Sequence, residues 1–392
     1  MRSGRGFGHF PATGPVRRLL VRRPGMEARP GKLSALVALA ALSGCAMLDG
    51  QRPGPGVDEA SAVALPRTMP LVTDRFELGP GVGDVVGGIQ IVESRHEDTL
   101  LDIARAYGLG YDEIVAANPG VNPWLPGEGT AIVLPTQFVL PQGEREGIVL
   151  NVATRRLFYF PEPEAGAVPL VLTHPVGIGR VGWNTPVGTT TVVGKARDPV
   201  WWVPASVRKE HADMGNPLPA RVPPGPDNPL GHRVLQLGMP GYLIHGTNRP
   251  DGIGMRVSHG CMQLFPEDIE RLYDITPIGT PVRIVNDPYP TGWRDGRLYL
   301  DAHAPLEEDS SDHGGRIRSL LDSMAASAAH VADEIDLDRV AALIEDARGF
   351  PVPVTGPDAD AQAVLARAQP VTNIVVRAPP ATAAGGRTVV AD

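Results

Sequence analysis

Two histidines and one cysteine lie close together in the sequence, at positions 245, 259 and 261. His245 ends the apolar run YLIH, and His259 precedes Cys261 by two residues in the stretch VSHGCMQL. A cysteine attacks a carbonyl carbon as the thiolate, and because its free pKa is about 8.5 it needs a nearby imidazole or other positive field at neutral pH. On a strand, residues two apart point to the same face. The spacing therefore predicts nucleophilic catalysis by Cys261, with an imidazole as base.

Glycines stand directly beside both histidines. Gly246 follows His245 and Gly260 follows His259. A glycine lets the backbone approach a substrate closely, and its amide N–H is expected to be free to stabilise a developing oxyanion.

Two less reactive interpretations fit the same three side chains. His245, His259 and Cys261 are residue types that bind zinc, which would leave a fourth position open. No acidic fourth ligand suggests itself nearby, so we expect no metal and no other cofactor. A cysteine is also often a small buried hydrophobic residue without chemistry.

The composition limits the classes of partner. The chain has 392 residues, of which 42% are hydrophobic and 20% charged, so it can bury a core and form two or three domains. Its net charge is -8, which gives no basic footprint for nucleic acid. We expect no nucleic-acid partner and a monomer.

Residues 1–44 have the pattern of an export signal, with Met26 as the expected true start. Arg29 and Lys32 precede the apolar run LSALVALAALSGCA, which is too short to span a bilayer. A twin-arginine signal around Arg17 and Arg22 is an alternative. The stretch LSGC resembles the bacterial lipoprotein processing site, which implies that Cys45 carries lipid.

The lipoprotein resemblance also indicates a location. Ala46 after Cys45 implies the outer membrane rather than the inner one, with the chain anchored in the periplasm. A lipidated Cys45 has no thiol, so Cys261 cannot form an intramolecular disulfide. An unpaired cysteine in an exported protein indicates a reactive thiol or intermolecular pairing.

Residues 45–83 are rich in Pro and Gly and are expected to form a tether. Residues 84–136 predict a strand in GGIQIVES, a helix in TLLDIARAYG capped by Asp98, a second helix in YDEIVAANPG, and a strand in TAIVLP. This βααβ order resembles the LysM module, which implies binding to peptidoglycan glycan. The alternative is a small α+β packing module without a ligand.

Residues 147–287 contain short runs rich in Val, Ile and Thr, separated by loops dense in Pro and Gly. They predict an antiparallel β-sandwich or barrel, so the protein is mainly β. Trp201 and Trp202 are either a wall of a substrate groove or part of the core. Residues 288–392 are expected to hold one or two helices, the second capped by Asp336 and stopped at Gly349, followed by a disordered tail.

The stretch GYLIHGTN, followed by GIGMRVSHGCMQL, resembles the L,D-transpeptidase catalytic domain of the YkuD/ErfK type. Two further stretches, TPVGTTTVVGKARDPVWWVP and VPPGPDNPLGHRVLQLG, extend the resemblance. It implies that Cys261 is the nucleophile and His245 the base, with the imidazole held by a backbone carbonyl near Gly246. It also implies an oxyanion site shaped by His259, Gly260 and the Cys261 amide.

One position departs from the family pattern. The second residue after the cysteine is usually Arg or Asn in this family, and here it is Gln263. Gln keeps an amide but lacks the charge of Arg, so substrate contacts there are in question. We expect substrate contacts at Ser258, Gln263 and Thr247.

The resemblance implies a cysteine acyltransferase of peptidoglycan. Its nucleophile would form a thioester with the third residue of a tetrapeptide stem, usually meso-diaminopimelate, and release the terminal D-alanine. An amine from a second stem, or a lysine of an outer-membrane lipoprotein, would resolve the thioester. Resolution by water would make the protein an L,D-carboxypeptidase or endopeptidase. A lipoprotein that only tethers the cell wall is the non-catalytic alternative.

Overall fold

A computed structural model describes residues 68–71, 73–327, 335–357 and 360–376. All of these residues belong to the same compact unit. The predicted signal region, the start at Met26, the lipidation site Cys45 and most of the predicted tether lie outside the described residues.

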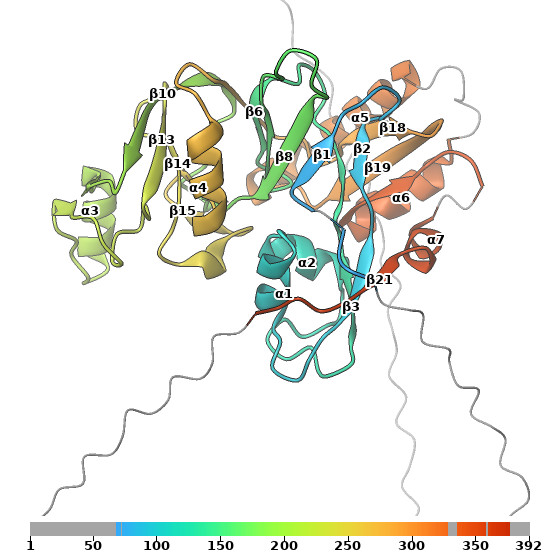
Figure 1. Ribbon diagram of the computed structural model, residues 1–392, viewed down its shortest axis with the longest axis horizontal. Coiled ribbons are helices and arrows are strands. Elements are labelled where there is room, and N and C mark those ends of the chain that lie inside the picture. Colours follow the sequence, from blue (N-terminus) through green and yellow to red (C-terminus); the bar gives the residue numbers. More distant parts are fainter. Residues whose placement is uncertain (1–67, 72, 328–334, 358–359, 377–392) are drawn as a thin grey trace, which may run out of the picture. The chain divides into compact units, whose positions relative to one another are not determined.

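The largest sheet among the described residues has nine strands (Figure 1). Its spatial order is β1 (Arg75–Glu77), β8 (Leu170–Pro175), β7 (Arg156–Phe160), β6 (Gly147–Asn151), β17 (Pro281–Val285), β10 (Gly188–Arg197), β13 (Arg233–Leu237), β14 (Leu243–His245) and β16 (Met262–Gln263). Neighbours are antiparallel except for β6 with β17 and β14 with β16. The runs of Val, Ile and Thr in the sequence predicted most of these strands, and the mainly β architecture is confirmed.

The long strand β10 connects the two halves of this sheet. Its first residues pair with β17 and its later residues pair with β13, with an irregular register between Val192 and Gly194. Ile148 of β6 and Leu235 of β13 belong to the same hydrophobic core, so the two halves enclose one apolar interior. Helix α4 (Pro266–Ile275) adds Ile269 and Leu272 to this core.

Strands β6 and β7 are buried on both faces. In β7, Leu157 and Tyr159 pack into the core just described, whereas Phe158 and Phe160 pack into a second core on the other face. A strand covered on both sides has no polar face, which explains the continuous apolar run LFYF.

The second core is built largely by residues 84–139. They form β2 (Val85–Gly87), β3 (Gln90–Glu93), α1 (Leu100–Ala106), α2 (Tyr111–Ala117), β4 (Ala131–Leu134) and β5 (Gln137–Val139). The predicted strand–helix–helix–strand order is present, and β3 pairs with β4. The cap of α1 is Thr99, in a capping box with Asp102, rather than the predicted Asp98. Asp98 instead accepts a hydrogen bond from the Arg95 amide in the preceding turn.

The tether prediction is wrong from residue 75 onward. Strand β1 pairs with β8 at the edge of the large sheet, with Phe76 opposite Val171. The strand is only three residues long and lies among Pro and Gly residues, so it has no clear local signal. Its pairing partner lies about a hundred residues further along the chain.

The prediction of a disordered tail is also wrong as far as residue 376. Residues 288–327 and 335–353 form a sheet of β18 (Thr291–Arg294), β19 (Arg297–His303) and β20 (Arg348–Pro353), covered by α5 (His313–Ser327) and α6 (Leu337–Asp346). Asp336 caps α6 as predicted, and the helix stops at Ala347 rather than at Gly349. Helix α7 (Ala361–Ala366) follows, and β21 (Gln369–Val371) pairs with β3.

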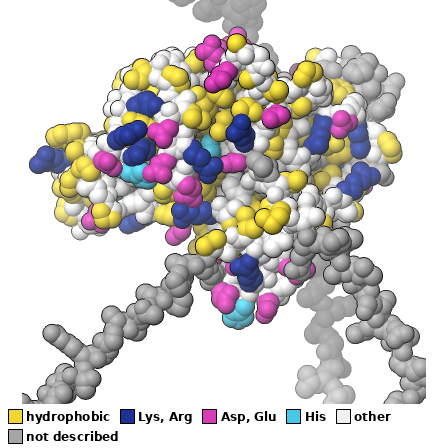
Figure 2. Space-filling view, in the orientation of Figure 1, with side chains coloured by type: hydrophobic (Ala, Val, Ile, Leu, Met, Phe, Trp, Pro, Cys, Tyr) yellow, Lys and Arg dark blue, Asp and Glu magenta, His cyan; other side chains and the backbone are white. Residues whose placement is uncertain are grey.

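The surface carries both signs of charge. Figure 2 shows Lys and Arg side chains interspersed with Asp and Glu on this face. No helix among the described residues is long and apolar enough to cross a membrane.

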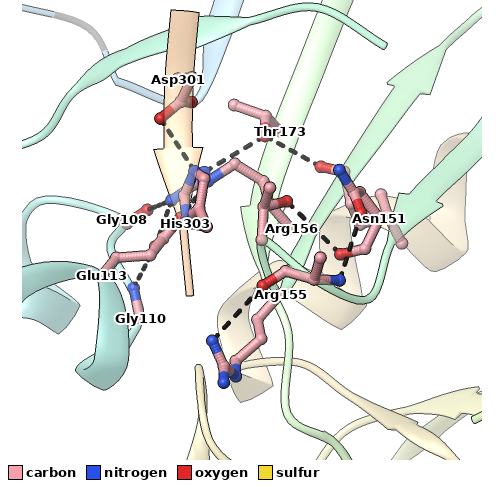
Figure 3. A network of polar contacts seen from close by, with 12 residues as sticks. Gly108, Gly110, Glu113, Asn151, Arg155, Arg156, Thr173, Asp301 and His303 are labelled. Carbon is pink, nitrogen blue, oxygen red and sulfur yellow. Dashed lines mark hydrogen bonds and ion pairs between the residues drawn. The ribbon is translucent and has the colours of Figure 1, made fainter. Parts of the chain in front are cut away.

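A buried ion pair joins residues 84–139 to the nine-stranded sheet (Figure 3). The Arg156 Nε and Nη2 atoms donate to the two carboxylate oxygens of Glu113, at 2.6 and 2.7 Å. Arg156 is 1% exposed and Glu113 is 7% exposed. The remaining guanidinium hydrogen bonds go to the Gly108 carbonyl and the Thr173 hydroxyl. Every guanidinium nitrogen and carboxylate oxygen of the pair therefore has a hydrogen-bond partner, which favours burying two charges together.

We predict that Glu113→Gln lowers the free energy of unfolding by about 3–5 kcal/mol, because it leaves the Arg156 charge buried without its counter-ion. Denaturant unfolding of the purified protein measures the change. The matched control is Glu267→Gln, which removes the partner of Arg105 in a pair whose side chains are 44% and 43% exposed. That control should cost less than about 1 kcal/mol, and equal losses in the two variants would contradict the prediction.

Candidate active site

Two parallel strands place His245 and Cys261 on one side of the sheet. In the register of β14 with β16, Ile244 is the neighbour of Met262 and His245 is the neighbour of Gln263. Ile244 and Met262 are fully buried in the core. Because side chains alternate along a strand, His245 and Gln263 point to the other side. Cys261 directly precedes β16, and extending the alternation back from Gln263 assigns its side chain to the same side as His245.

The His245 imidazole is buried and held by the backbone. Its Nδ1 lies 2.6 Å from the Gly246 carbonyl oxygen, which can only accept. The Nδ1 atom therefore carries the proton, and Nε2 of the neutral ring is left as an acceptor. Burial lowers the pKa of His245 to about 4, so the ring is neutral at neutral pH.

The Cys261 thiol is half-buried and also neutral. Its Sγ donates a long hydrogen bond of 3.7 Å to the Gly241 carbonyl. Burial raises the pKa of the thiol to about 11. The expectation that an imidazole populates the thiolate in the free protein is therefore not met. The arrangement instead suits a proton transfer from Cys261 to an imidazole acceptor at the moment of attack.

His259 lies in a charged cluster that the sequence analysis did not anticipate. Its Nε2 is 2.8 Å from Glu210 Oε2 and 3.0 Å from Arg180 Nη2. The Trp183 indole packs against the ring in an edge-to-face arrangement, with centroids 4.8 Å apart. Hydrogen bonds from Arg180 and then His259 hold the pKa of Glu210 at about 2. No local pattern pointed to Glu210, which precedes the cysteine by some fifty residues.

The expectation of free amides at the two glycines is wrong. The Gly260 N–H donates to Ser258 Oγ at 3.1 Å, and the Gly246 N–H donates to the Arg233 carbonyl at 3.2 Å. Gly260 has a conformational role instead. Its φ is +104°, and a Cβ there would lie 3.0 Å from the Tyr242 ring.

The predicted substrate contacts at Ser258 and Thr247 need a similar correction. Both residues are buried, and Ser258 Oγ donates to the Cys261 carbonyl at 2.6 Å. Thr247 Oγ1 accepts the Arg249 amide. These hydroxyls order the loops on which the histidines and cysteine lie. Gln263 is half-buried, and its backbone exchanges two hydrogen bonds of 2.8 Å with Gly177.

The zinc interpretation finds no geometric support. Within the part of the chain that the structure describes, no group of three or more His, Cys, Asp or Glu side chains could hold a metal ion. His259 points its Nε2 at Glu210 and Arg180.

The segment that connects β14 to β15 (Arg256–Ser258) rests on the start of α2. The Tyr111 amide donates to the Ile253 carbonyl at 3.1 Å. A Cβ on Gly254 would lie 2.4 Å from the Gly110 Cα, and one on Gly110 would lie 2.7 Å from the Gly254 Cα. Two glycines therefore allow direct backbone contact between the 84–139 region and a segment that joins His245 to His259.

Comparison with known proteins agrees with this geometry. The family model of the L,D-transpeptidase catalytic domain (YkuD) matches residues 145–284. Probable L,D-transpeptidase ErfK/SrfK of Salmonella typhimurium is 38% identical over 267 residues, which are 67% of this chain and 85% of that protein. Probable L,D-transpeptidase YbiS of Escherichia coli K12 is 38% identical over 299 residues, 75% of this chain and 92% of that protein.

A solved structure, L,D-transpeptidase 3 from Mycobacterium tuberculosis, overlaps 39% of this chain and 66% of its own at 22% identity, with a TM-score of 0.26. With so low a TM-score, this structural similarity does not assign the family. The extended similarity to the two probable L,D-transpeptidases is sufficient: the chain belongs to the L,D-transpeptidase (YkuD) family. It is a cysteine acyltransferase.

We predict that Cys261 reacts slowly with iodoacetamide at pH 7, where a thiol with a pKa of about 11 is ionised in about one molecule in ten thousand. The rate should rise about tenfold per pH unit until it levels near pH 11. Intact-mass kinetics on the full chain measure it, with Cys261→Ala as the background. A rate that levels off below pH 8 would show a preformed thiolate instead.

We predict that Gly110→Ala slows acylation of Cys261, because its new methyl group must push against the Gly254 backbone. The matched control is Gly88→Ala in the same region, whose nearest neighbour would be a Leu71 methyl at 3.6 Å. Acyl-enzyme formation followed by mass spectrometry compares the two. Identical rates would show that the backbone contact does not position the segment.

Proposed function

We propose that this protein is a periplasmic peptidoglycan L,D-transpeptidase that acylates Cys261 with the third residue of a tetrapeptide stem. The observation that carries the proposal is the His245 imidazole, locked by the Gly246 carbonyl with Nε2 left as acceptor, on the same side of the sheet as Cys261. The family relationship supplies the reaction class.

In the first half-reaction the Cys261 sulfur attacks the carbonyl carbon, and His245 Nε2 takes the thiol proton. The carbonyl electron pair moves to the oxygen, where we assign the Cys261 backbone N–H as the stabilising donor. Return of that pair breaks the bond to D-alanine, whose nitrogen receives the proton from His245. A thioester and free D-alanine result.

In the second half-reaction an amine attacks the thioester. His245 takes a proton from the amine, and the tetrahedral intermediate expels the Cys261 sulfur, which recovers a proton. A new amide joins two stems through their third residues, or joins a stem to a lipoprotein lysine. Because both groups are neutral at rest, the charges exist only while the bonds change.

The remaining parts of the proposal concern location and wall contact. Lipid on Cys45 would anchor the chain to the outer membrane, and residues 84–136 would bind peptidoglycan glycan as a LysM module. Trp124 supports the second point, because it is 59% exposed and pairs with the Tyr111 ring at 6.4 Å. Exposed aromatic side chains of this kind give an amphipathic surface on which a sugar ring can pack. We expect a monomer, and Gln263 stays a proposed substrate contact.

We predict that disaccharide-tetrapeptide gives a covalent adduct on the full chain with release of D-alanine, and that Cys261→Ala abolishes both. Intact-mass and product analysis detect the adduct and a dimer linked between third residues. His245→Asn should retain the thiol but lose at least about 100-fold in acylation rate, since general-base catalysis typically contributes that much.

Other products would indicate a different function. Tripeptide without dimer indicates resolution by water, as in an L,D-carboxypeptidase. No adduct on the wild-type protein would overturn the catalytic proposal and favour a wall-tethering lipoprotein, whose cellular role Cys261→Ala would leave intact.

A further inference from the structure

A flap of residues 199–228 lies between β10 and β13 and carries β11 (Trp201–Trp202), α3 (Ala205–Asp213) and β12 (Arg221–Val222). Asn228, which is 1% exposed, closes its base by donating to the carbonyls of Pro199 at 2.7 Å and Pro223 at 3.1 Å. Within the flap, β11 pairs with β12. Trp202 is 69% exposed, so it does not belong to the core.

Helix α3 contacts the catalytic motif mainly through polar groups. Val207 is its one buried residue. Glu210 accepts from Arg180 Nη2 with both carboxylate oxygens, at 2.5 and 2.6 Å, and from Trp183 Nε1 at 3.3 Å. Glu210 is therefore the main hydrogen-bonding contact between α3 and the stretch that holds His259.

Backbone pairing fixes Arg180 beside Ser258, three residues before the nucleophile. Strand β9 (Ile178–Gly179) pairs with β15, and the Arg180 amide donates to the Ser258 carbonyl at 3.0 Å. The loop that follows contacts Gly260, since Thr185 Oγ1 donates to its carbonyl at 3.0 Å. The backbone of Arg180 is thus held by hydrogen bonds next to the stretch Ser258–Cys261.

The Arg180–Glu210 contact is open to exchange with a ligand. The side chains of Arg180, Glu210 and His259 are 36%, 26% and 28% exposed. A carboxylate from outside could replace Glu210 with little change in hydrogen bonding, because it offers the same two oxygens to the same guanidinium.

The proposed donor carries such a carboxylate close to the reacting bond. The terminal D-alanine ends in a carboxylate one residue beyond the attacked carbonyl, and one residue spans roughly 3.8 Å. The Arg180 guanidinium contacts His259, two residues before Cys261, and is therefore the candidate partner of this carboxylate when the carbonyl lies at Cys261.

We propose that Arg180 binds the terminal carboxylate of the donor stem, and that Glu210 occupies this position in the unliganded protein until the donor displaces it together with α3. The inference rests on the proposed function and names a residue for donor recognition. Arg180 is then a specificity-determining residue, and Glu210 is an internal competitor of the substrate.

The test compares two donors on the full chain, disaccharide-tetrapeptide with a free terminal carboxylate and the same compound with a terminal carboxamide. Acyl-enzyme formation by intact-mass kinetics gives kcat/KM for each. The wild type should prefer the carboxylate by roughly 10- to 100-fold, as expected for a charge-assisted hydrogen bond. In Arg180→Ala this preference should fall to about one, and Arg180→Lys should restore part of it. The different leaving groups cancel when the ratio is compared between variants.

Glu210→Gln should improve use of the carboxylate donor, whereas Arg180→Ala should weaken it. A misfolded variant would not show such an improvement. Weakening the competitor should lower KM for the carboxylate donor several-fold and leave the carboxamide donor unchanged. The matched control is Arg208→Ala, which removes an exposed arginine from the same helix and should keep the wild-type preference.

The outcomes separate this inference from the proposed function. Adducts on the wild type with equal rates for both donors, or an unchanged preference in Arg180→Ala, overturn the inference and leave the transpeptidase proposal intact. Equal losses of preference in Arg180→Ala and Arg208→Ala would assign the effect to net charge and overturn it too. No adduct with either donor on the wild type overturns both.

Discussion

The buried contact between Arg156 and Glu113 constrains much of this molecule (Figure 3). Neither charge can return to water without separating the catalytic sheet from helix α2, so the two must stay paired. Glu113 also accepts the Gly110 amide, which fixes the first turn of α2. Gly110 in turn contacts Gly254 in the segment between the two active-site histidines. A single ion pair is thus connected through one helix terminus to the geometry around Cys261.

The region 84–139 is part of the catalytic domain's interior as well as a module with its own strands and helices. Phe158 and Phe160 of the catalytic sheet share a core with Ile103 and Leu109. Without that cover, one face of β6 and β7 would expose a continuous apolar surface. Strand β21 closes the same region from the far end of the chain by pairing with β3.

Two electrostatic environments meet around the cysteine. His245 and Cys261 are neutral because desolvation disfavours their charged forms. Around His259, by contrast, Arg180 and Glu210 are partly exposed, and hydrogen bonds from Arg180 and then His259 lower the pKa of Glu210 to about 2. The first environment suits a proton that moves only during attack, and the second suits recognition of a charged ligand.

The sequence by itself determined those features that a local pattern of residues can predict. The spacing of His245, His259 and Cys261 predicted a thiol nucleophile, and the apolar periodicity predicted α1 and the main strands, because these signals are local. Only the tertiary structure decided how the amides of Gly246 and Gly260 are used, that Glu210 reaches His259, and that β1 and β21 belong to sheets. Apart from the Gly260 amide, which donates to Ser258 two residues away, each of these depends on a partner more than ten residues away along the chain. A short strand or a single carboxylate carries no periodic signal of its own, and burial by distant segments decides whether a thiol or an imidazole is charged.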